Sequence, residues 1–284
     1  RSTGGVFFST AMEKLLVDMD LKGFSTNTKK TYLLSINHFS AHFGAKPEAL
    51  GEDEIRQYLH HEIVKRKQSS SSVIVAYSAL RFFFETTLGR EWNARAFPRV
   101  KRGNKLPDIL SRTEVVQLLD AANNLKHKAI LMTAYAAGLR ASEIANLKVG
   151  DIDSKNMEIF IRQGKGQIDR YSLLSSLNLA VLRQYYKQYR PVLWLFPGQD
   201  PAKPINVKTL SMIFKNIKVK IVSIHSLRHS FATHLLEDGV DICHIQKLLG
   251  HKNISTTSRY LHLTRLHLKK IKSPLDTMPE PIDE

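Results

Sequence analysis

The chain has 284 residues, of which 43% are hydrophobic, enough for two folded domains of ordinary size. Its 42 Lys and Arg against 26 Asp and Glu give a net charge of +16, which favours nucleic acid as a partner, although charge alone also fits an anionic membrane surface. No apolar run approaches the roughly 20 residues that span a bilayer, and the first residues lack the apolar segment of a signal peptide. The single cysteine, Cys243, excludes an internal disulfide, so we expect a cytoplasmic protein without a membrane partner.

The first hundred residues predict a small helical bundle. Thr10 and Glu13 have the spacing of a capping box, and the apolar residues that follow them recur at helical spacing. Further helices are predicted over residues 28–43 and 52–65, and from the four serines at 69–72 to about residue 86. We therefore expect residues 1–94 to form a helical domain.

Residues 95–107 differ from both flanking regions because five basic side chains occur there without an acidic one between them. They are Arg95, Arg99, Lys101, Arg102 and Lys105. Bounded by Pro98 and Pro107, the stretch predicts an extended interdomain linker that contacts phosphates, although a solvated loop would have the same composition. Ser111 and Glu114 then form a second capping box, which opens the next domain.

That second domain, residues 108–270, is expected to be mainly helical with one small β-hairpin. In chain order the pattern predicts a helix around 126–137, strands at 157–162 and 168–173, and helices from 177 to 270 with a loop at 196–204. Lys165 stands between two glycines at the hairpin tip. Residues 271–284 contain prolines and acidic residues and are predicted to be flexible unless a neighbouring subunit holds them.

Four segments of the second domain carry side chains with complementary chemistry. They contribute Arg140 with Glu143, then Lys165, then His225 with Arg228, and finally His251 with Tyr260. Each alone has an ordinary explanation as a surface charge or a core residue. A metal site at His225 and His229 is the competing interpretation of the third segment. It is disfavoured because Arg228 would repel a cation and no third ligand is evident.

Taken together, these side chains could cleave a phosphodiester. Two arginines can hold the non-bridging oxygens and offset the charge that develops at phosphorus. A tyrosine hydroxyl can attack when a base or an electropositive pocket helps to remove its proton, for which His225 or another histidine of the site is available. A lysine on a hairpin can protonate the oxygen that leaves.

The ordered set Arg140, Lys165, His225, Arg228, His251 and Tyr260 resembles the tyrosine recombinases, or phage integrase family, and residues 225–260 match the family's C-terminal signature. The resemblance implies a two-domain C-clamp, in which a helical SAM-like core-binding domain is joined to a mixed α/β catalytic domain. It also implies that both arginines clamp the phosphate, that Glu143 supports the first, and that Lys165 protonates the 5′ oxygen. His225 would then act in proton transfer, His251 would bond the phosphate and Tyr260 would attack.

By this resemblance the protein is expected to be a site-specific DNA recombinase or integrase, similar to Xer or transposon-encoded enzymes of bacteria or archaea and acting at the nucleoid. It would work through a 3′-phosphotyrosine and a Holliday junction, without metal, ATP or another cofactor. The expected partner is double-stranded DNA carrying recombination sites, bound by a homotetramer that forms from free monomers or dimers. The alternatives are a type IB topoisomerase-like strand relaxer and a catalytically silent DNA-binding protein.

Overall fold

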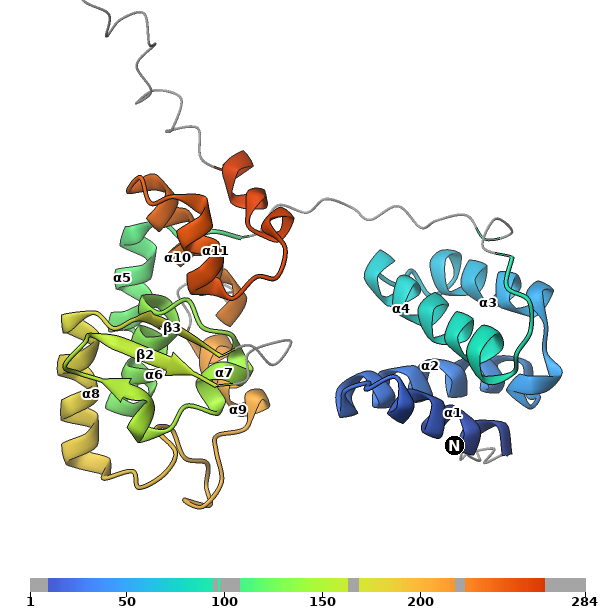
Figure 1. Ribbon diagram of the computed structural model, residues 1–284, viewed down its shortest axis with the longest axis horizontal. Coiled ribbons are helices and arrows are strands. Elements are labelled where there is room, and N and C mark those ends of the chain that lie inside the picture. The colour runs from blue at the N-terminus through green and yellow to red at the C-terminus, as the bar shows by residue number, and fades with distance from the viewer. Residues whose placement is uncertain (1–9, 94–96, 98–107, 163–168, 218–222, 264–284) are drawn as a thin grey trace, which may run out of the picture. The chain divides into compact units, whose positions relative to one another are not determined.

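The computed structural model describes residues 10–93, 97, 108–162, 169–217 and 223–263. The chain divides into two compact units, residues 1–105 and 106–284 (Figure 1). Each unit has its own buried apolar core. The predicted boundary and most of the predicted linker, including its five basic side chains, fall outside the described residues and remain predictions.

The first unit is a bundle of helices, as predicted. It comprises α1 (Thr10–Leu21), α2 (Thr26–Phe43), the 3₁₀ turn η1 (Pro47–Ala49), α3 (Glu52–Val64), α4 (Ser70–Arg81) and the π-helix η2 (Phe82–Thr87). Ser25 and Ser69 cap α2 and α4 by accepting backbone N–H bonds, and Gly44 ends α2 in a left-handed conformation. Thr10 already lies inside α1, so it is not the N-cap that the capping-box spacing predicted.

The second unit combines helices with a three-stranded sheet. Its elements are α5 (Arg112–Asp120), α6 (Leu125–Ala136), α7 (Ala141–Ala145), η3 (Val149–Asp151), β1 (Ile152–Asp153), β2 (Glu158–Ile161), β3 (Arg170–Leu173), α8 (Ser176–Tyr189), α9 (Val207–Asn216), α10 (Ile224–Glu237), α11 (Ile242–Leu249), η4 (Ile254–Thr256) and η5 (Ser258–Leu263). The strands are antiparallel in the order β1-β2-β3, with Ile159 opposite Ser172. This architecture confirms the predicted mainly helical fold with a small sheet.

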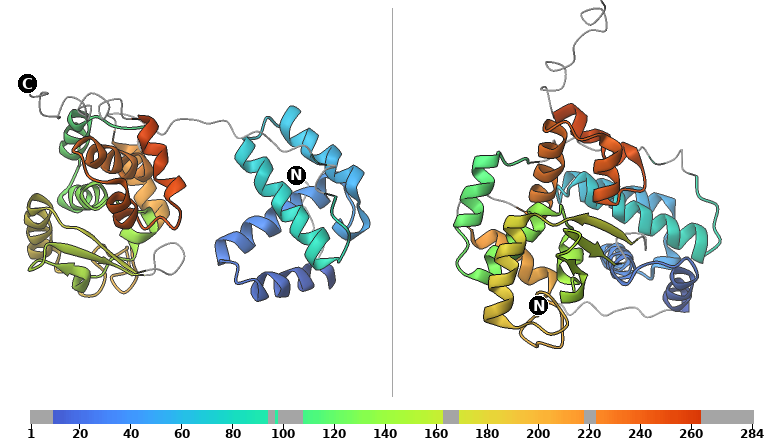
Figure 2. Two further views of the ribbon diagram at one scale, coloured as in Figure 1. Left: turned by 45° about the horizontal axis from the view of Figure 1, so that its top comes forward. Right: turned by 60° about the vertical axis from the view of Figure 1, so that its left-hand side comes forward.

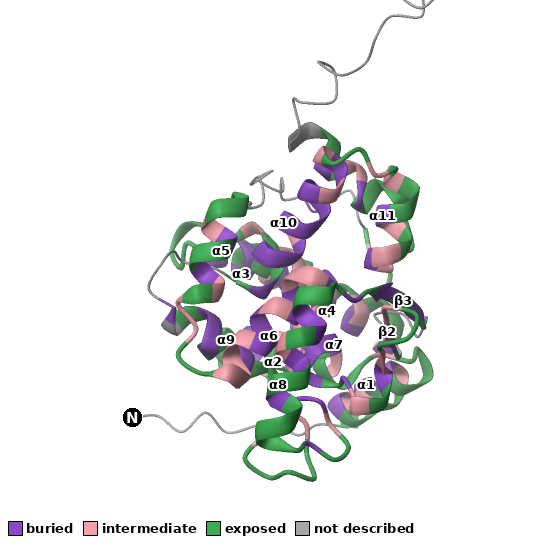
Figure 3. Ribbon diagram, turned by 90° about the vertical axis from the view of Figure 1, so that its left-hand side faces the viewer, coloured by how far each residue is buried: buried purple, intermediate pink, exposed green. Residues whose placement is uncertain are grey.

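The core of the second unit is built around α6 and α10. Ile130, Leu131 and Ala134 of α6 are fully buried, and α6 packs against both α8 and α10. Figure 3 shows α10 buried over most of its length, whereas α8 exposes one side. Helix α11 packs against α10 and also lies beside β3, as the views in Figures 1 and 2 show. This arrangement brings together the starts of α7 and α10, strand β3 and the C-terminal end of α11.

One detail differs from the sequence-based expectations. Tyr260 lies on the 3₁₀ helix η5 rather than on a regular α-helix. Cys243 is exposed, because Ile245 and Leu249 form the buried side of α11. In the described part of the chain, every helix is either too short or too polar to cross a lipid bilayer.

Candidate active site

The carboxylate of Glu143 is shared by three arginines. Arg140 donates to it from its backbone N–H (2.8 Å) and from Nη1 (2.7 Å). Arg170 of β3 donates through both terminal nitrogens, Nη1 to Oε1 at 2.9 Å and Nη2 to Oε2 at 2.8 Å, and Nη1 of Arg228 lies 3.6 Å from Oε2. Burial alone would raise the pKa of Glu143, but the bonds and charge of Arg170, followed by Arg140 and Arg228, lower it to about 2.

The turn that precedes α7 requires a glycine. Gly138 has a φ of +59°, and a Cβ there would lie 2.3 Å from Cδ1 of Phe231 on α10. This close approach lets the Gly138 carbonyl accept a bond from Nη1 of Arg228 at 2.7 Å. Two residues later Arg140 is the N-cap of α7, and Glu143 bonds back to its N–H as in a capping box. The predicted neighbourhood of Arg140 and Glu143 is therefore formed by ordinary helix-start chemistry.

The last carbonyls of α11 each accept a bond from a different arginine. Leu248 accepts from Nε of Arg170 at 2.8 Å, Leu249 from Nη2 of Arg228, and Gly250 from Nη2 of Arg140 at 3.4 Å. Carbonyls at a helix C-terminus lack intrahelical partners and carry partial negative charge, which favours cations there. The end of α11 thus organises the three guanidinium groups as much as Glu143 does.

Arg228 is buried, with 3% of its surface exposed. Burial, and then the charge of Arg140, lowers its pKa to about 9, although Glu143 opposes the shift. Three guanidinium groups share one carboxylate, so among these four side chains two positive charges have no counter-ion. A buried surplus of positive charge with forked donors is suited to hold an anion such as a phosphodiester.

His251 follows the end of α11 and contacts this cluster. Its Nε2 lies 3.2 Å from Nη2 of Arg228, which can only donate, so Nδ1 carries the proton and donates to Oγ1 of Thr257 at 2.8 Å. Burial and then the charges of Arg228 and Arg140 lower the pKa of His251 to about 4. His251 is therefore a neutral imidazole with a defined tautomer at neutral pH.

Tyr260 and His225 complete the described part of the site. Tyr260 is 3% exposed and packs with apolar residues of α10 and α11. Burial raises the pKa of its hydroxyl, and the charges of Arg228, Arg259 and Arg140 oppose that shift, so Tyr260 lies in the field of the arginines. His225, in the first turn of α10, is more exposed. Its pKa is lowered by partial burial and then by the charges of Arg228 and Arg140.

Two participants were not predicted from the sequence. Arg170 was overlooked because its partner, Glu143, lies on another element; the only local signal is that Arg170 and Ser172 take the inward positions of β3. His229 was considered only as a metal ligand, yet its Nδ1 lies 2.9 Å from Oη of Tyr260.

No group of three His, Cys, Asp or Glu residues suited to a metal ion occurs in the described ranges. Lys165 lies outside the described residues.

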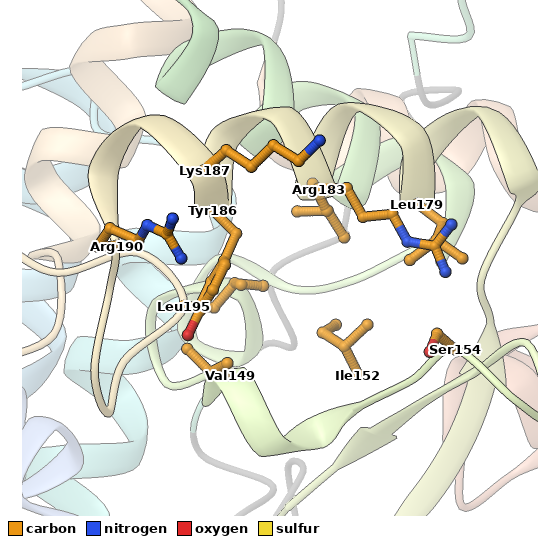
Figure 4. A pocket seen from close by; sticks show the side chains of 10 residues that line it. Val149, Ile152, Ser154, Leu179, Arg183, Tyr186, Lys187, Arg190 and Leu195 are labelled. Carbon is orange, nitrogen blue, oxygen red and sulfur yellow. The ribbon is translucent and has the colours of Figure 1, made fainter.

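A cavity adjoins the arginine cluster, whereas a second one is unrelated to it. The first, of about 360 Å³, is lined by Arg170, Gly250, His251 and the basic residues Lys247 and Lys252, among others. The second, of about 500 Å³, lies beside α8 with an apolar floor and a basic rim (Figure 4). None of the predicted site residues lines the second cavity. Of the predicted catalytic residues that the structure describes, His251 lines the first cavity, beside Arg170 of the arginine cluster.

Comparisons with known proteins identify relatives of both units. Residues 108–267 match the phage integrase family, and residues 12–94 match the N-terminal SAM-like domain of phage integrases. The protein y4qK of Sinorhizobium fredii is 42% identical over 275 residues, covering 95% of this chain and 89% of the relative. The tyrosine recombinase XerA of Pyrococcus horikoshii is 34% identical over 268 residues, covering 92% of each chain.

A solved structure shares the fold across both units. The site-specific recombinase XerH, bound to a palindromic difH substrate after cleavage, superposes with a TM-score of 0.68 at 21% identity, covering 92% of this chain and 83% of XerH. The fold, the arginine cluster and these relatives together define a tyrosine-type recombinase that acts on DNA. The chain belongs to the phage integrase family, and it is an enzyme of DNA recombination and integration.

Proposed function

We propose that this enzyme cuts and rejoins DNA at specific sites by forming a 3′-phosphotyrosine link through Tyr260. The observation that carries the proposal is the set of three arginines around one carboxylate, which leaves positive charge without a counter-ion within the field that acts on Tyr260. An incoming phosphodiester supplies the missing negative charge. Because the link retains the phosphoester bond energy, rejoining needs no ATP.

We assign the roles of the individual residues by the family resemblance, and the positions of those that the structure describes support the assignment. Arg140, which is partly exposed, and Arg228, which is buried and fixed by two carbonyls, bind the non-bridging oxygens while Glu143 keeps them aligned. His251 adds a contact to the phosphate and His225 takes part in proton transfer. Lys165 protonates the leaving 5′ oxygen.

The assembly is proposed on the same basis. The two units clasp duplex DNA as a C-clamp, and the basic linker that contains Arg95, Arg99, Lys101, Arg102 and Lys105 crosses its phosphates. Four copies on two duplexes exchange strands through a Holliday junction, and residues 271–284 of each copy dock on its neighbour. The partner is double-stranded DNA in a bacterial or archaeal cell.

The decisive experiment is capture of the covalent intermediate. The Tyr260→Phe protein, which keeps the aromatic ring, is first used to select bound duplexes from a random-sequence pool. The selected duplex, end-labelled and nicked so that the cleaved end diffuses away, is then incubated with the wild type in EDTA and resolved under denaturing conditions. A labelled adduct with the wild type and none with Tyr260→Phe is expected.

Other outcomes identify the alternatives. Tight binding without an adduct would indicate a catalytically silent DNA-binding protein. An adduct together with relaxation of supercoiled DNA, but without exchange between two labelled duplexes, would indicate a topoisomerase-like strand relaxer.

A further inference from the structure

The hydroxyl of Tyr260 has a specific partner. Nδ1 of His229 lies 2.9 Å from Oη of Tyr260, and among the residues described no other side chain hydrogen-bonds this hydroxyl. His229 directly follows Arg228 on α10, so one turn of this helix supplies a guanidinium group to the arginine cluster and an imidazole to the tyrosine. The backbone of α10 therefore fixes His229, which contacts the nucleophile, relative to Arg228, which belongs to the proposed phosphate site.

The direction of this hydrogen bond follows from the protonation states. Burial, and then the charges of His225, Arg259 and Arg228, lowers the pKa of His229 to about 4, so its imidazole is neutral at pH 7. Burial raises the pKa of Tyr260, so its phenol is protonated. The phenol therefore donates, Nδ1 accepts, and Nε2 of His229 carries the ring proton.

Building on the function proposed above, we propose that His229 is the proton acceptor for Tyr260 during strand cleavage and returns the proton during rejoining. As Oη forms its bond to phosphorus, its O–H bond breaks and the proton passes to Nδ1 of His229. The bond from phosphorus to the 5′ oxygen breaks at the same time, and that oxygen takes a proton from Lys165. In rejoining, the 5′ hydroxyl attacks phosphorus and protonated His229 gives its proton back to Oη.

The surroundings of His229 fit this exchange. Arg259 and Arg228, which lower the pKa of His229 in the free protein, also act on Tyr260, where they favour the phenolate together with Arg140. A phosphodiester bound at the arginines brings negative charge that offsets them and makes the imidazole a better base. His225, one turn earlier on α10, is more exposed and has no hydrogen bond to Tyr260 within the described contacts, so the part in proton transfer proposed for it above is not the removal of the Tyr260 proton.

The chain offers a matched control on the same helix. Nδ1 of His234 lies 2.8 Å from Oη of Tyr135, a pair of the same kind among residues to which no role in the site is assigned. His229→Asn keeps an acceptor close to the position of Nδ1 but cannot take a proton, and His234→Asn makes the same change in the control pair. Both variants are compared with the wild type in single-turnover formation of the covalent adduct on the selected duplex, from pH 5 to 9.

A loss of the proton acceptor has a distinct pH signature. We expect His229→Asn to form the adduct about 10² to 10⁴ times more slowly at pH 7. Its rate should rise about tenfold per pH unit, because Tyr260 must then ionise unaided. The rates of the wild type and His234→Asn should depend much less on pH, since the imidazole of His229 accepts the proton and Tyr260 need not ionise beforehand. All three proteins should bind the duplex equally.

Three results would overturn the assignment. A His229→Asn rate within about threefold of the wild type would remove any role for His229 in cleavage. A slow variant whose pH profile runs parallel to that of the wild type would reduce His229 to a purely positioning residue. In the wild-type protein, nitrogen NMR that finds the ring proton of His229 on Nδ1 would also exclude proton acceptance, and this measurement does not depend on the folding of a variant. Failure of the wild type itself to form an adduct would instead count against the proposed function.

Discussion

At the scale of single residues, the site depends on one carboxylate with three cationic partners. Glu143 is buried, and Arg140 and Arg170 bond both of its oxygens. Removing one member of a buried ionic group is costly because the remaining charges stay buried without compensation. Glu143 therefore sets both the stability of this part of the fold and the geometry of the phosphate site.

Replacing Glu143 by Gln, which has the same shape without the charge, should reduce the free energy of unfolding of the second unit by about 3 to 5 kcal/mol. The measurement is urea unfolding followed by fluorescence of Trp194 in a Trp92→Phe background, because these are the two tryptophans of the chain. Asp238→Asn serves as the control, since it breaks the exposed Arg112–Asp238 pair of the same unit and should cost at most about 1 kcal/mol. Equal effects of the two changes would mean that Glu143 is not the counter-ion of the cluster.

At the scale of secondary-structure elements, the end of α11 is the feature that shapes the site. Gly250 ends this helix with a φ of +62°, and a Cβ there would lie 3.0 Å from Cδ of Arg170. Gly44 ends α2 of the other unit with a nearly identical φ of +64° and has open space around it. The two glycines therefore share one backbone requirement and differ in their neighbours.

Gly250→Ala and Gly44→Ala should each lose about 1 to 2 kcal/mol from the left-handed backbone. Only Gly250→Ala should also displace Arg170 and slow formation of the covalent adduct, by roughly tenfold, about 1.4 kcal/mol in the barrier. Adduct formation on the selected duplex, at a temperature where both variants are folded, separates the two effects. A comparable loss of activity in Gly44→Ala would show that backbone strain alone is responsible.

The elements themselves were largely predictable, because capping residues and helical periodicity are local. Ser111 caps α5 with Glu114 as expected, and α2 begins two residues before the predicted start. The type of helix at Tyr260 was not predictable, since a tight 3₁₀ segment has no distinct local pattern. The bond of Arg170 to Glu143 joins residues 27 positions apart, and no local pattern indicates such a partner.

At the scale of the whole molecule, the positive charge that suits the protein to DNA also makes it sensitive to acid. His229 and His251 have pKa values lowered to about 4 by burial and by neighbouring cations. In the unfolded chain both would bind protons near pH 6.5, so the unfolded state takes up more protons between pH 6.5 and 4. Stability is therefore full above pH 6.5 and is lost as the pH falls toward 4.

The free energy of unfolding should fall by a few kcal/mol between pH 7 and 4.5. Urea unfolding monitored by Trp194 fluorescence measures this, and a variant with Asn at both histidines should lose much of the dependence. Glu143 does not contribute in this window, because its pKa of about 2 moves its own transition to more acidic conditions. A pH dependence that is the same in the double variant would assign the effect to other groups.

The burial of Tyr260 has a mechanical consequence. Its ring belongs to the buried apolar cluster that joins α10 to α11, which also contains Phe231, Leu236, Ile245 and Leu249. A DNA strand attached to this side chain would transmit tension directly into a folded contact between two helices rather than into a loose loop. Pulling on such a strand in an optical trap should register the rupture of that helix pair, so the apolar cluster would limit the force that the covalent complex withstands before it unfolds.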